Sequence, residues 1–273
     1  MASEDLKAER KPGLCLAGAG GLGFLHIGLF EALEELAIHP GIVAGTSSGA
    51  VMGALFAAGK TSGEIRAILR DFRWDRIVAP TIPRRGFLST ARMQAFYRKH
   101  LGSIDLSDLP IPLRVAAVDL RSGELTGFTA GPIEKCLAAS CTMPGVFDPV
   151  TIDGRMYIDA GGIYNLPLEL LSGEGLDCII AGNTIGEYGL MAEPRTVQET
   201  YYQAYLIRSR RLTAWRTGPN GWDGRKGEKL VMVDYHSHGA NPRGLKDCSA
   251  MIDETRELAL EVLRKAFGNR GKA

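Results

Sequence analysis

Ser47 lies at the centre of the pentapeptide 45–49, GTSSG, between the apolar run 41–44 and the run of small and apolar residues 50–55. A G-x-S-x-G pattern between a short strand and a helix is typical of a nucleophile elbow, a sharp and strained turn that exposes the serine. Glycines on either side let the strand and the helix approach closely. The following helix then directs its N-terminal N–H groups toward a developing oxyanion. We therefore predict that Ser47 is a nucleophile, with a purely structural turn as the alternative.

The glycine string 18–23 follows an apolar strand predicted at 14–17 and precedes a helix predicted at 24–36. It also fits G-x-G-x-x-G, the dinucleotide-binding pattern, which requires an acidic residue at the end of a second strand about twenty positions later. Here the second strand, 42–44, ends in the serine turn and offers no carboxylate. We therefore interpret the glycines as backbone N–H donors at a helix start, suited to a negatively charged oxygen.

Composition excludes several classes of protein. The chain has 273 residues, 45% of them hydrophobic, and a formal net charge of +1, which argues for a globular protein and against a nucleic-acid partner. Its five cysteines form no C-x-x-C pair and are interpreted as reduced thiols. Residues 1–11 are polar and mixed in charge, unlike a signal or transit peptide. We expect a cytoplasmic protein with a polar tail over 1–12 and a single domain over 13–268.

Two uncharged stretches, 12–30 and 36–59, are long enough to span a membrane. Glycine clusters interrupt both, so we predict strand–turn–helix units instead. Elsewhere strands and helices alternate along the chain, which favours one α/β domain. The further strands are predicted at 113–119, 125–129, 156–158, 177–181 and 230–235, and the further helices at 50–58, 62–72 (with Ser62 as N-cap), 90–101, 132–139, 196–217 and 249–267. Segments 81–87 and 218–227 are predicted loops; the Arg84-Arg85 pair in the first is interpreted as solvated, with a phosphate contact as the alternative.

A serine nucleophile requires a base that accepts its proton. His236 and His238 follow a late strand, where a serine–histidine–carboxylate hydrolase places its histidine. Asp159 competes with them, because a hairpin turning at Asp153-Gly154 delivers it to a loop of small residues. Spacing alone leaves both alternatives open.

Three blocks of sequence resemble the patatin-like phospholipase family, in that family's order. They are residues 14–35 together with 45–50 (LCLAGAGGLGFLHIGLFEALEE and GTSSGA), 139–147 (ASCTMPGVF) and 159–167 (DAGGIYNLP). The chain looks like a bacterial-type member with a single patatin domain. The resemblance implies a three-layer α/β/α fold with a central, mostly parallel sheet, and hydrolysis of lipid acyl esters without a metal or other cofactor. It implies a dyad of Ser47 as nucleophile and Asp159 as general base, with an oxyanion hole at Gly20, Gly21 and Leu22.

Two positions depart from the family pattern. Leu22 stands where the family usually has a basic residue, and Ala160 stands where it has glycine after the aspartate. Leucine keeps its backbone N–H, so we expect a weakened rather than abolished oxyanion hole, and Leu22→Arg to raise turnover or leave it unchanged. Alanine is costly if its position needs a positive φ. His26, which the family often shares, is interpreted as a packing residue.

The leading functional prediction is a lipid acyl hydrolase of the phospholipase A or lysophospholipase type that contacts a membrane surface transiently, acting on phospholipid or lysophospholipid through an acyl-enzyme on Ser47. The alternatives are an acyltransferase with the same acyl-enzyme and a catalytically weakened lipid-binding relative. Ser48→Ala is expected to cost little, because the elbow exposes only one of the two hydroxyls.

Overall fold

The computed structural model describes residues 11–70, 72–82, 84–187, 193–218, 221, 228–238 and 248–268. The strands in chain order are β1 (Gly13–Leu16), β2 (Ile42–Thr46), β3 (Ala79–Pro80), β4 (Leu88–Ser89), β5 (Leu113–Asp119), β6 (Leu125–Phe128), β7 (Val150–Ile152), β8 (Arg155–Asp159), β9 (Cys178–Glu187) and β10 (Lys229–His236). The α-helices are α1 (His26–Glu35), α2 (Ser48–Ala57), α3 (Ser62–Leu69), α4 (Trp74–Ile77), α5 (Ala91–Leu101), α6 (Ile133–Ser140), α7 (Val197–Thr217) and α8 (Ser249–Phe267). Short 3₁₀ helices are η1 (Gly20–Leu25), η2 (Leu106–Asp108), η3 (Ala160–Gly162) and η4 (Leu168–Leu170).

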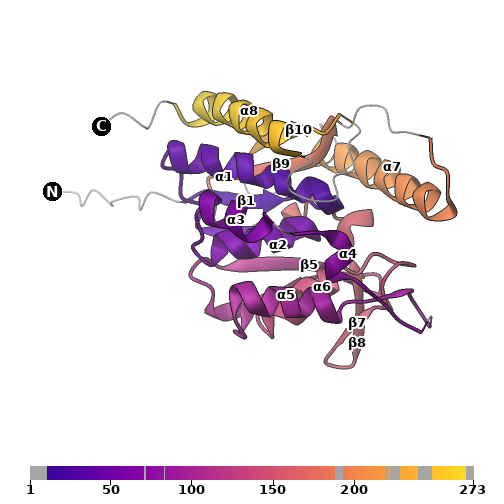
Figure 1. Ribbon diagram of the computed structural model, residues 1–273. Helices are drawn as coiled ribbons and strands as arrows, with labels where there is room; N and C mark the ends of the chain where they lie inside the picture. The colour runs from indigo at the N-terminus through magenta and orange to yellow at the C-terminus, as the bar shows by residue number, and fades with distance from the viewer. Residues whose placement is uncertain are drawn as a thin grey trace.

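The central sheet is mostly parallel. Strands β10, β9, β1, β2 and β5 lie side by side in this order and run in the same direction (Figure 1). Strand β5 also pairs antiparallel with β6 and with β8, and β8 pairs antiparallel with β7. The predicted α/β class with a mostly parallel central sheet is confirmed.

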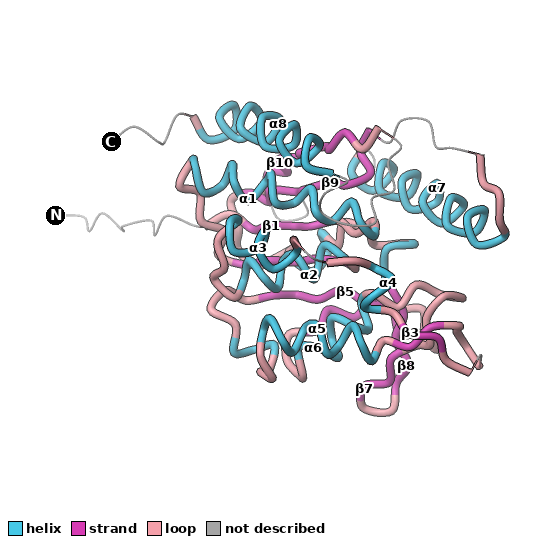
Figure 2. Tube along the Cα trace, viewed as in Figure 1, coloured by secondary structure: helices cyan, strands magenta, loops and turns pink. Residues whose placement is uncertain are grey.

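Both faces of the sheet are buried, as a parallel sheet requires. Side chains alternate between the faces along each strand, so Leu14 and Leu16 of β1 pack against the helices while Cys15 and Ala17 contact the opposite side. Figure 2 shows α1, α2, α5 and α6 overlying one face of the sheet. The other face packs against the segment that follows β8, which contains η3 and η4.

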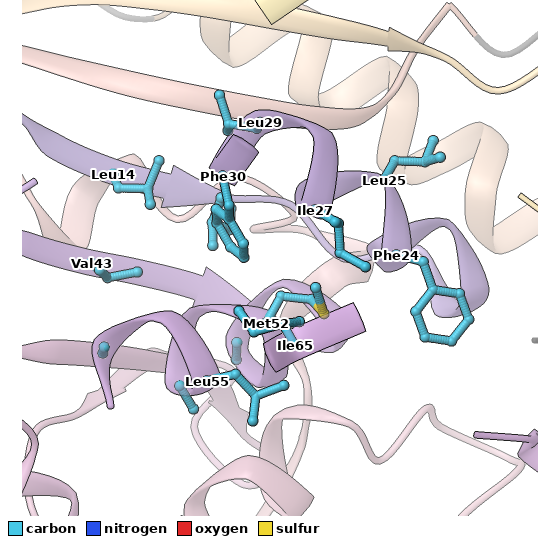
Figure 3. Close-up of a cluster of buried hydrophobic side chains, with 14 of the residues drawn as sticks. Leu14, Phe24, Leu25, Ile27, Leu29, Phe30, Val43, Met52, Leu55 and Ile65 are labelled. Atoms are coloured by element: carbon cyan, nitrogen blue, oxygen red, sulfur yellow. The ribbon is translucent and has the colours of Figure 1, made fainter. Parts of the chain in front are cut away.

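The largest core cluster lies between the sheet and the helix layer. Figure 3 shows Phe30 of α1 directed toward the strands that carry Leu14 and Val43, and Leu55 of α2 belongs to the same cluster. These side chains are at most 2% exposed. Burying such a side chain contributes roughly 1.5–3 kcal/mol, so this cluster fixes the two strand–helix units that carry both glycine-rich motifs.

Most predicted elements are present with bounds shifted by a few residues. The uncharged stretches 12–30 and 36–59 form strand–turn–helix units, and no helix in the described part of the chain is both long and apolar enough to cross a bilayer. Helix α3 is capped by Thr61 rather than Ser62, because Thr61 and Glu64 form a reciprocal capping box. The Ser62 hydroxyl instead donates to Glu34 of α1 at 2.6 Å. The short helix α4 was not predicted, and most of the predicted loop 218–227 lies outside the described residues.

Candidate active site

Strands β2 and β8 follow one another along the same edge of β5. Strand β6 occupies the other edge, where it pairs with Ala116 and Ala117. The same two residues also face Thr46 of β2 and Asp159 of β8, which therefore share the opposite edge. Because β2 runs parallel to β5 and β8 antiparallel, their C-terminal ends meet at adjacent positions, which are about 3.3 Å apart along a strand. Ser47 directly follows Thr46, so the sheet brings it beside Asp159.

Ser47 occupies the strained turn between β2 and α2, with φ 53° and ψ −127°. Glycines are required around it for steric reasons. A Cβ on Gly49 would lie 2.3 Å from the Leu16 carbonyl oxygen, and one on Gly18 would lie 2.7 Å from the Ser47 Cβ. The chain therefore has the geometry of a nucleophile elbow, with the serine at the N-terminus of α2.

The backbone and side chain of Ser47 are both held by neighbours. Its N–H donates to the Ser140 hydroxyl at 2.8 Å, and that hydroxyl donates to the Ala116 carbonyl at 2.6 Å. The Ser47 side chain lies close enough to the Asp159 carboxyl and the Cys141 thiol to lower the pKa of both groups. The block 139–147 thus supports the elbow directly.

Asp159 is a buried carboxylate that the fold keeps hydrogen-bonded. It is 7% exposed, and burial raises its pKa to about 6 although three neighbouring groups lower it. The Gly161 N–H donates to the carboxylate at 2.7 Å and the Tyr205 hydroxyl at 3.3 Å, and the Ser47 side chain is the third group. A carboxylate with a pKa near neutrality is well matched to accept a proton and return it.

Three hydrogen bonds hold the glycine loop in place, and one of them joins it to the elbow. The Gly18 N–H donates to Asn165 Oδ1 at 3.1 Å, and the Gly18 carbonyl accepts from the Thr184 hydroxyl at 2.6 Å. The Ala19 N–H donates to the Ser48 hydroxyl at 3.2 Å. Ser48 therefore positions the glycine loop. Because Ser48→Ala would remove this hydrogen bond, the substitution is no longer expected to be harmless.

Gly20 and Gly21 begin η1 and line the same cavity as Ser47. The first N–H groups of a helix have no acceptor within that helix, so these two amides are suited to bind an anionic oxygen. The N–H of Leu22 instead donates to the Ala19 carbonyl at 3.1 Å, and its side chain is 1% exposed and packed in the core. The Leu22 amide is thus already engaged, unlike the expectation from sequence. An arginine introduced here would be directed into the core, which removes the basis for expecting Leu22→Arg to raise turnover.

The alanine after Asp159 is accommodated without strain. Ala160 is the first residue of η3, and no positive φ occurs there; among the described non-glycine residues positive φ is found at Ala37, Ser47, Asp153 and His238. Its side chain is buried against Ala116 and Val118 of β5. Alanine in place of the family's glycine therefore causes no backbone strain at this position.

The histidines lie away from the Ser47 hydroxyl. His26 is fully buried, contacts the Ala17 carbonyl and the Tyr235 hydroxyl at 2.8 Å each, and has a pKa lowered by burial to about 4. It is a neutral packing residue at the start of α1, as predicted. His236 and His238 both contact Glu254 of α8, and neither belongs to the described lining of the cavity.

A cavity of about 510 Å³ contains the Ser47 and Asp159 side chains. This volume is within the range of roughly 300–1,000 Å³ typical of small-molecule sites. The glycine loop and the elbow form its floor, Met143 and Phe147 line one wall, and Tyr202, Tyr205 and other residues of α7 cover it. The floor and the wall with Met143 and Phe147 come from the three sequence blocks, whereas the residues of α7 do not.

A profile of the patatin-like phospholipase family matches residues 14–172, which include both sides of the elbow and Asp159. The chain belongs to the patatin-like phospholipase family. An uncharacterized NTE family protein of Mycobacterium tuberculosis is 34% identical over 176 residues, covering 62% of this chain and 47% of that protein. Lysophospholipase nte1 of Aspergillus fumigatus is 27% identical over 183 residues, covering 63% of this chain and 12% of that protein.

Among solved structures, VipD from Legionella pneumophila shares the fold with a TM-score of 0.55 at 17% identity, covering 94% of this chain and 67% of VipD. The chain spans less than half the length of the curated relatives it matches first. Family membership and fold of this patatin-like domain are therefore shown by these comparisons.

Several residues of the site were not identified from the sequence. Tyr205 lies on α7, beyond the segment matched by the family, and nothing local in the sequence connects it with Asp159. Ser140 and Asn165 fall inside the family blocks, which was a usable signal, but their roles depend on contacts across the fold. Asn165 also has a buried Nδ2 without a hydrogen-bond acceptor among the described residues.

Proposed function

We propose that this chain is a lipid acyl hydrolase of the phospholipase A or lysophospholipase type, with Ser47 as nucleophile and Asp159 as general base. One observation carries the proposal. The C-terminal ends of β2 and β8 meet on one edge of β5, so Ser47 and the buried Asp159 carboxylate line the same cavity, and the Ser47 side chain lowers the pKa of that carboxylate. A strained serine paired with a base of raised pKa is the arrangement that activates a hydroxyl for acyl transfer.

In the acylation step Ser47 Oγ attacks the ester carbonyl carbon while its proton passes to Asp159. The carbonyl oxygen becomes an oxyanion, which the amides of Gly20 and Gly21 and the N-terminus of α2 would stabilise as hydrogen-bond donors beside the cavity. The tetrahedral intermediate then collapses and the bond to the alcohol oxygen breaks. Asp159 returns its proton to this leaving alcohol, and the acyl group remains on Ser47.

In the second step a water molecule attacks the acyl-enzyme. Asp159 takes the proton of that water, the bond between the acyl carbon and Ser47 Oγ breaks, and Oγ recovers the proton. The products are a fatty acid and the free enzyme. An alcohol in place of water would give acyl transfer by the same steps, so the acceptor separates hydrolase from acyltransferase.

The test is turnover on a panel of phospholipids, lysophospholipids and short-chain esters, together with labelling by a fluorophosphonate probe. We expect ester hydrolysis and labelling of the parent protein, and neither with Ser47→Ala. Ser209→Ala is the matched control, because Ser209 also lines the cavity but lies on α7. Labelling that persists in Ser47→Ala, or is lost in Ser209→Ala, would refute the assignment of the nucleophile.

The base is tested with three further variants. Asp159→Asn is expected to lower turnover by roughly three or more orders of magnitude, the scale for a base that acts as a unit with its nucleophile. His236→Ala and His238→Ala are expected to retain activity, since both histidines contact Glu254. If a histidine variant were as inactive as Asp159→Asn, the dyad would be wrong and a triad correct. If the parent protein hydrolysed no ester of the panel, it would instead be a lipid-binding relative of the hydrolases.

A further inference from the structure

The hairpin formed by β3 and β4 projects from the domain beside the cavity. Figure 1 shows it on the same side of the molecule as the N-terminal end of α7, past the C-terminal ends of the parallel strands. Its two large apolar side chains are unusually exposed, Ile82 by 79% and Phe87 by 64%. Arg84 and Arg85 lie between them and are exposed as well.

The hairpin is attached directly to a cavity wall. The N–H groups of Phe87 and Leu88 both donate to the Val146 carbonyl at 2.9 Å, and the Asp148 N–H donates to the Leu88 carbonyl at 3.0 Å. Phe147, between these two positions, lines the cavity. Phe87 and Leu88 of the hairpin therefore lie directly behind a wall of the cavity that holds Ser47, with the exposed apolar tip projecting beyond them.

The N-terminal turn of α7 borders the cavity from the other side. Thr196, Gln198 and Tyr202 line the cavity, whereas Val197 and Tyr201 alternate with them and face outward, exposed by 89% and 42%. We define the rim surface as Ile82, Arg84, Arg85, Phe87, Val197 and Tyr201. Apolar side chains of this size gain about 1.5–3 kcal/mol each when buried, which makes their exposure at a cavity mouth informative.

The hairpin side of the rim is also strongly basic, although the whole chain has a formal net charge of only +1. Residues 72–92 contain five arginines and a single acidic residue, Asp75. Two carboxylates near the rim accept backbone hydrogen bonds, Asp148 from the Arg85 N–H and Glu199 from the Arg195 N–H, and the exposed Glu193 adds a negative charge before α7 rather than on the hairpin side. Exposed apolar tips beside arginines match the chemistry of an anionic lipid surface, where head groups meet acyl chains.

We propose that the rim surface docks this protein on an anionic lipid surface, so that the cavity mouth faces the lipid. The proposal rests on the proposed function, because docking would bring acyl esters to the entrance of the cavity that holds Ser47. Lipid binding can nevertheless be measured without any turnover, so the two are tested separately. Ile82 and Phe87 enter the acyl region while Arg84 and Arg85 contact the head groups.

The experiment uses the Ser47→Ala protein, which leaves the vesicles intact, and measures co-sedimentation with two kinds of vesicle. We expect binding to phosphatidylcholine vesicles that contain phosphatidylglycerol and much weaker binding to phosphatidylcholine alone. Arg84→Ala with Arg85→Ala is expected to weaken binding about 30-fold at low salt, from the usual contribution of two arginines at an anionic surface. Ile82→Ser with Phe87→Ser is expected to weaken it about 100-fold or more.

Matched controls lie on the far half of α7. Trp215→Ser removes an apolar side chain that is 66% exposed but about 27 Å along the helix from Val197. Arg210→Ala with Arg211→Ala removes two exposed arginines of the same helix. Both controls are expected to bind like the parent, and rim variants with an otherwise active site are expected to hydrolyse a soluble ester at the parent rate.

Three results would overturn the proposal. They are absence of binding to either vesicle, equal binding by the rim variants, and equal loss in the controls. A dimer in light scattering that Ile82→Ser with Phe87→Ser abolishes, without vesicle binding, would assign the surface to a second copy of the chain. A protein that hydrolyses the soluble ester but does not bind vesicles would reject docking and leave the proposed hydrolase function standing. A protein that binds vesicles through the rim surface but hydrolyses no ester would reject only the hydrolase function.

Discussion

Asp159→Asn should make this protein more stable at neutral pH while it removes activity. The Asp159 carboxylate is buried at the end of β8, and burial raises its pKa from 3.8 to about 6. The folded protein therefore favours the protonated carboxyl more than the unfolded chain does. Asparagine has nearly the same shape, carries no charge and keeps an oxygen for the Gly161 N–H.

The magnitude follows from the two pKa values. The stability associated with the protonated carboxyl is fully present below pH 3.8 and is lost as the pH rises through about 6. One pKa unit corresponds to 1.36 kcal/mol, so the ionised group costs the folded state about 3 kcal/mol at pH 8. At pH 5 the folded state is still mostly protonated, and the cost is about half as large.

Urea unfolding of the parent and Asp159→Asn at pH 5 and at pH 8 measures this difference. We expect the variant to be more stable at both, with a gain that grows by about 1.5 kcal/mol between them. Asp119→Asn is the control of opposite sign, because the Arg121 N–H and other hydrogen bonds lower the pKa of Asp119. It should destabilise the protein at pH 8. An Asp159→Asn protein no more stable than the parent at pH 8, or with the same gain at both pH values, would refute the reasoning.

Three other substitutions test neighbouring contacts. Tyr205→Phe removes a hydrogen bond that lowers the pKa of Asp159, so the acidic limb of the pH–rate profile on a soluble ester should move from about 6 to higher pH, with turnover reduced severalfold. Ser140→Ala leaves the Ser47 N–H without its acceptor, and should cost roughly 1–3 kcal/mol in urea unfolding and lower kcat. Leu22→Arg directs a guanidinium into the core, and should destabilise by several kcal/mol rather than raise turnover; a stable, faster variant would contradict the packing of Leu22.

Local patterns predicted the secondary structure well where they were strong. The elbow around Ser47, the hairpin ending in Asp159 and the helix at 249–267 could all be located from glycine positions, turn residues and apolar spacing. The capping residue of α3 was misassigned because Thr61 and Ser62 are both good caps, and only the Glu64 contact distinguishes them. Boundaries of this kind depend on single hydrogen bonds.

The meeting of Ser47 with Asp159 could not be derived from spacing, because it depends on how three strands share β5. Residues 46 and 159 become neighbours only because β6 occupies the other edge of that strand. Family resemblance supplied the pairing that geometry now accounts for. Tyr205 had no such support, since its contact with Asp159 joins segments 46 residues apart without a motif between them.

The position of Leu22 explains why the missing family cation does not by itself argue for an inactive site. Its side chain packs in the core and its amide closes the first turn of η1, so neither one is directed at the cavity. The amides of Gly20 and Gly21 precede it, at the point where a helix start leaves N–H groups without acceptors. Each such donor to an oxyanion is worth about 3 kcal/mol in comparable enzymes, whereas a side-chain cation near solvent adds less. Any loss of activity in this chain should therefore be sought in the loop contacts of Gly18 and Ser48, which set where those amides point.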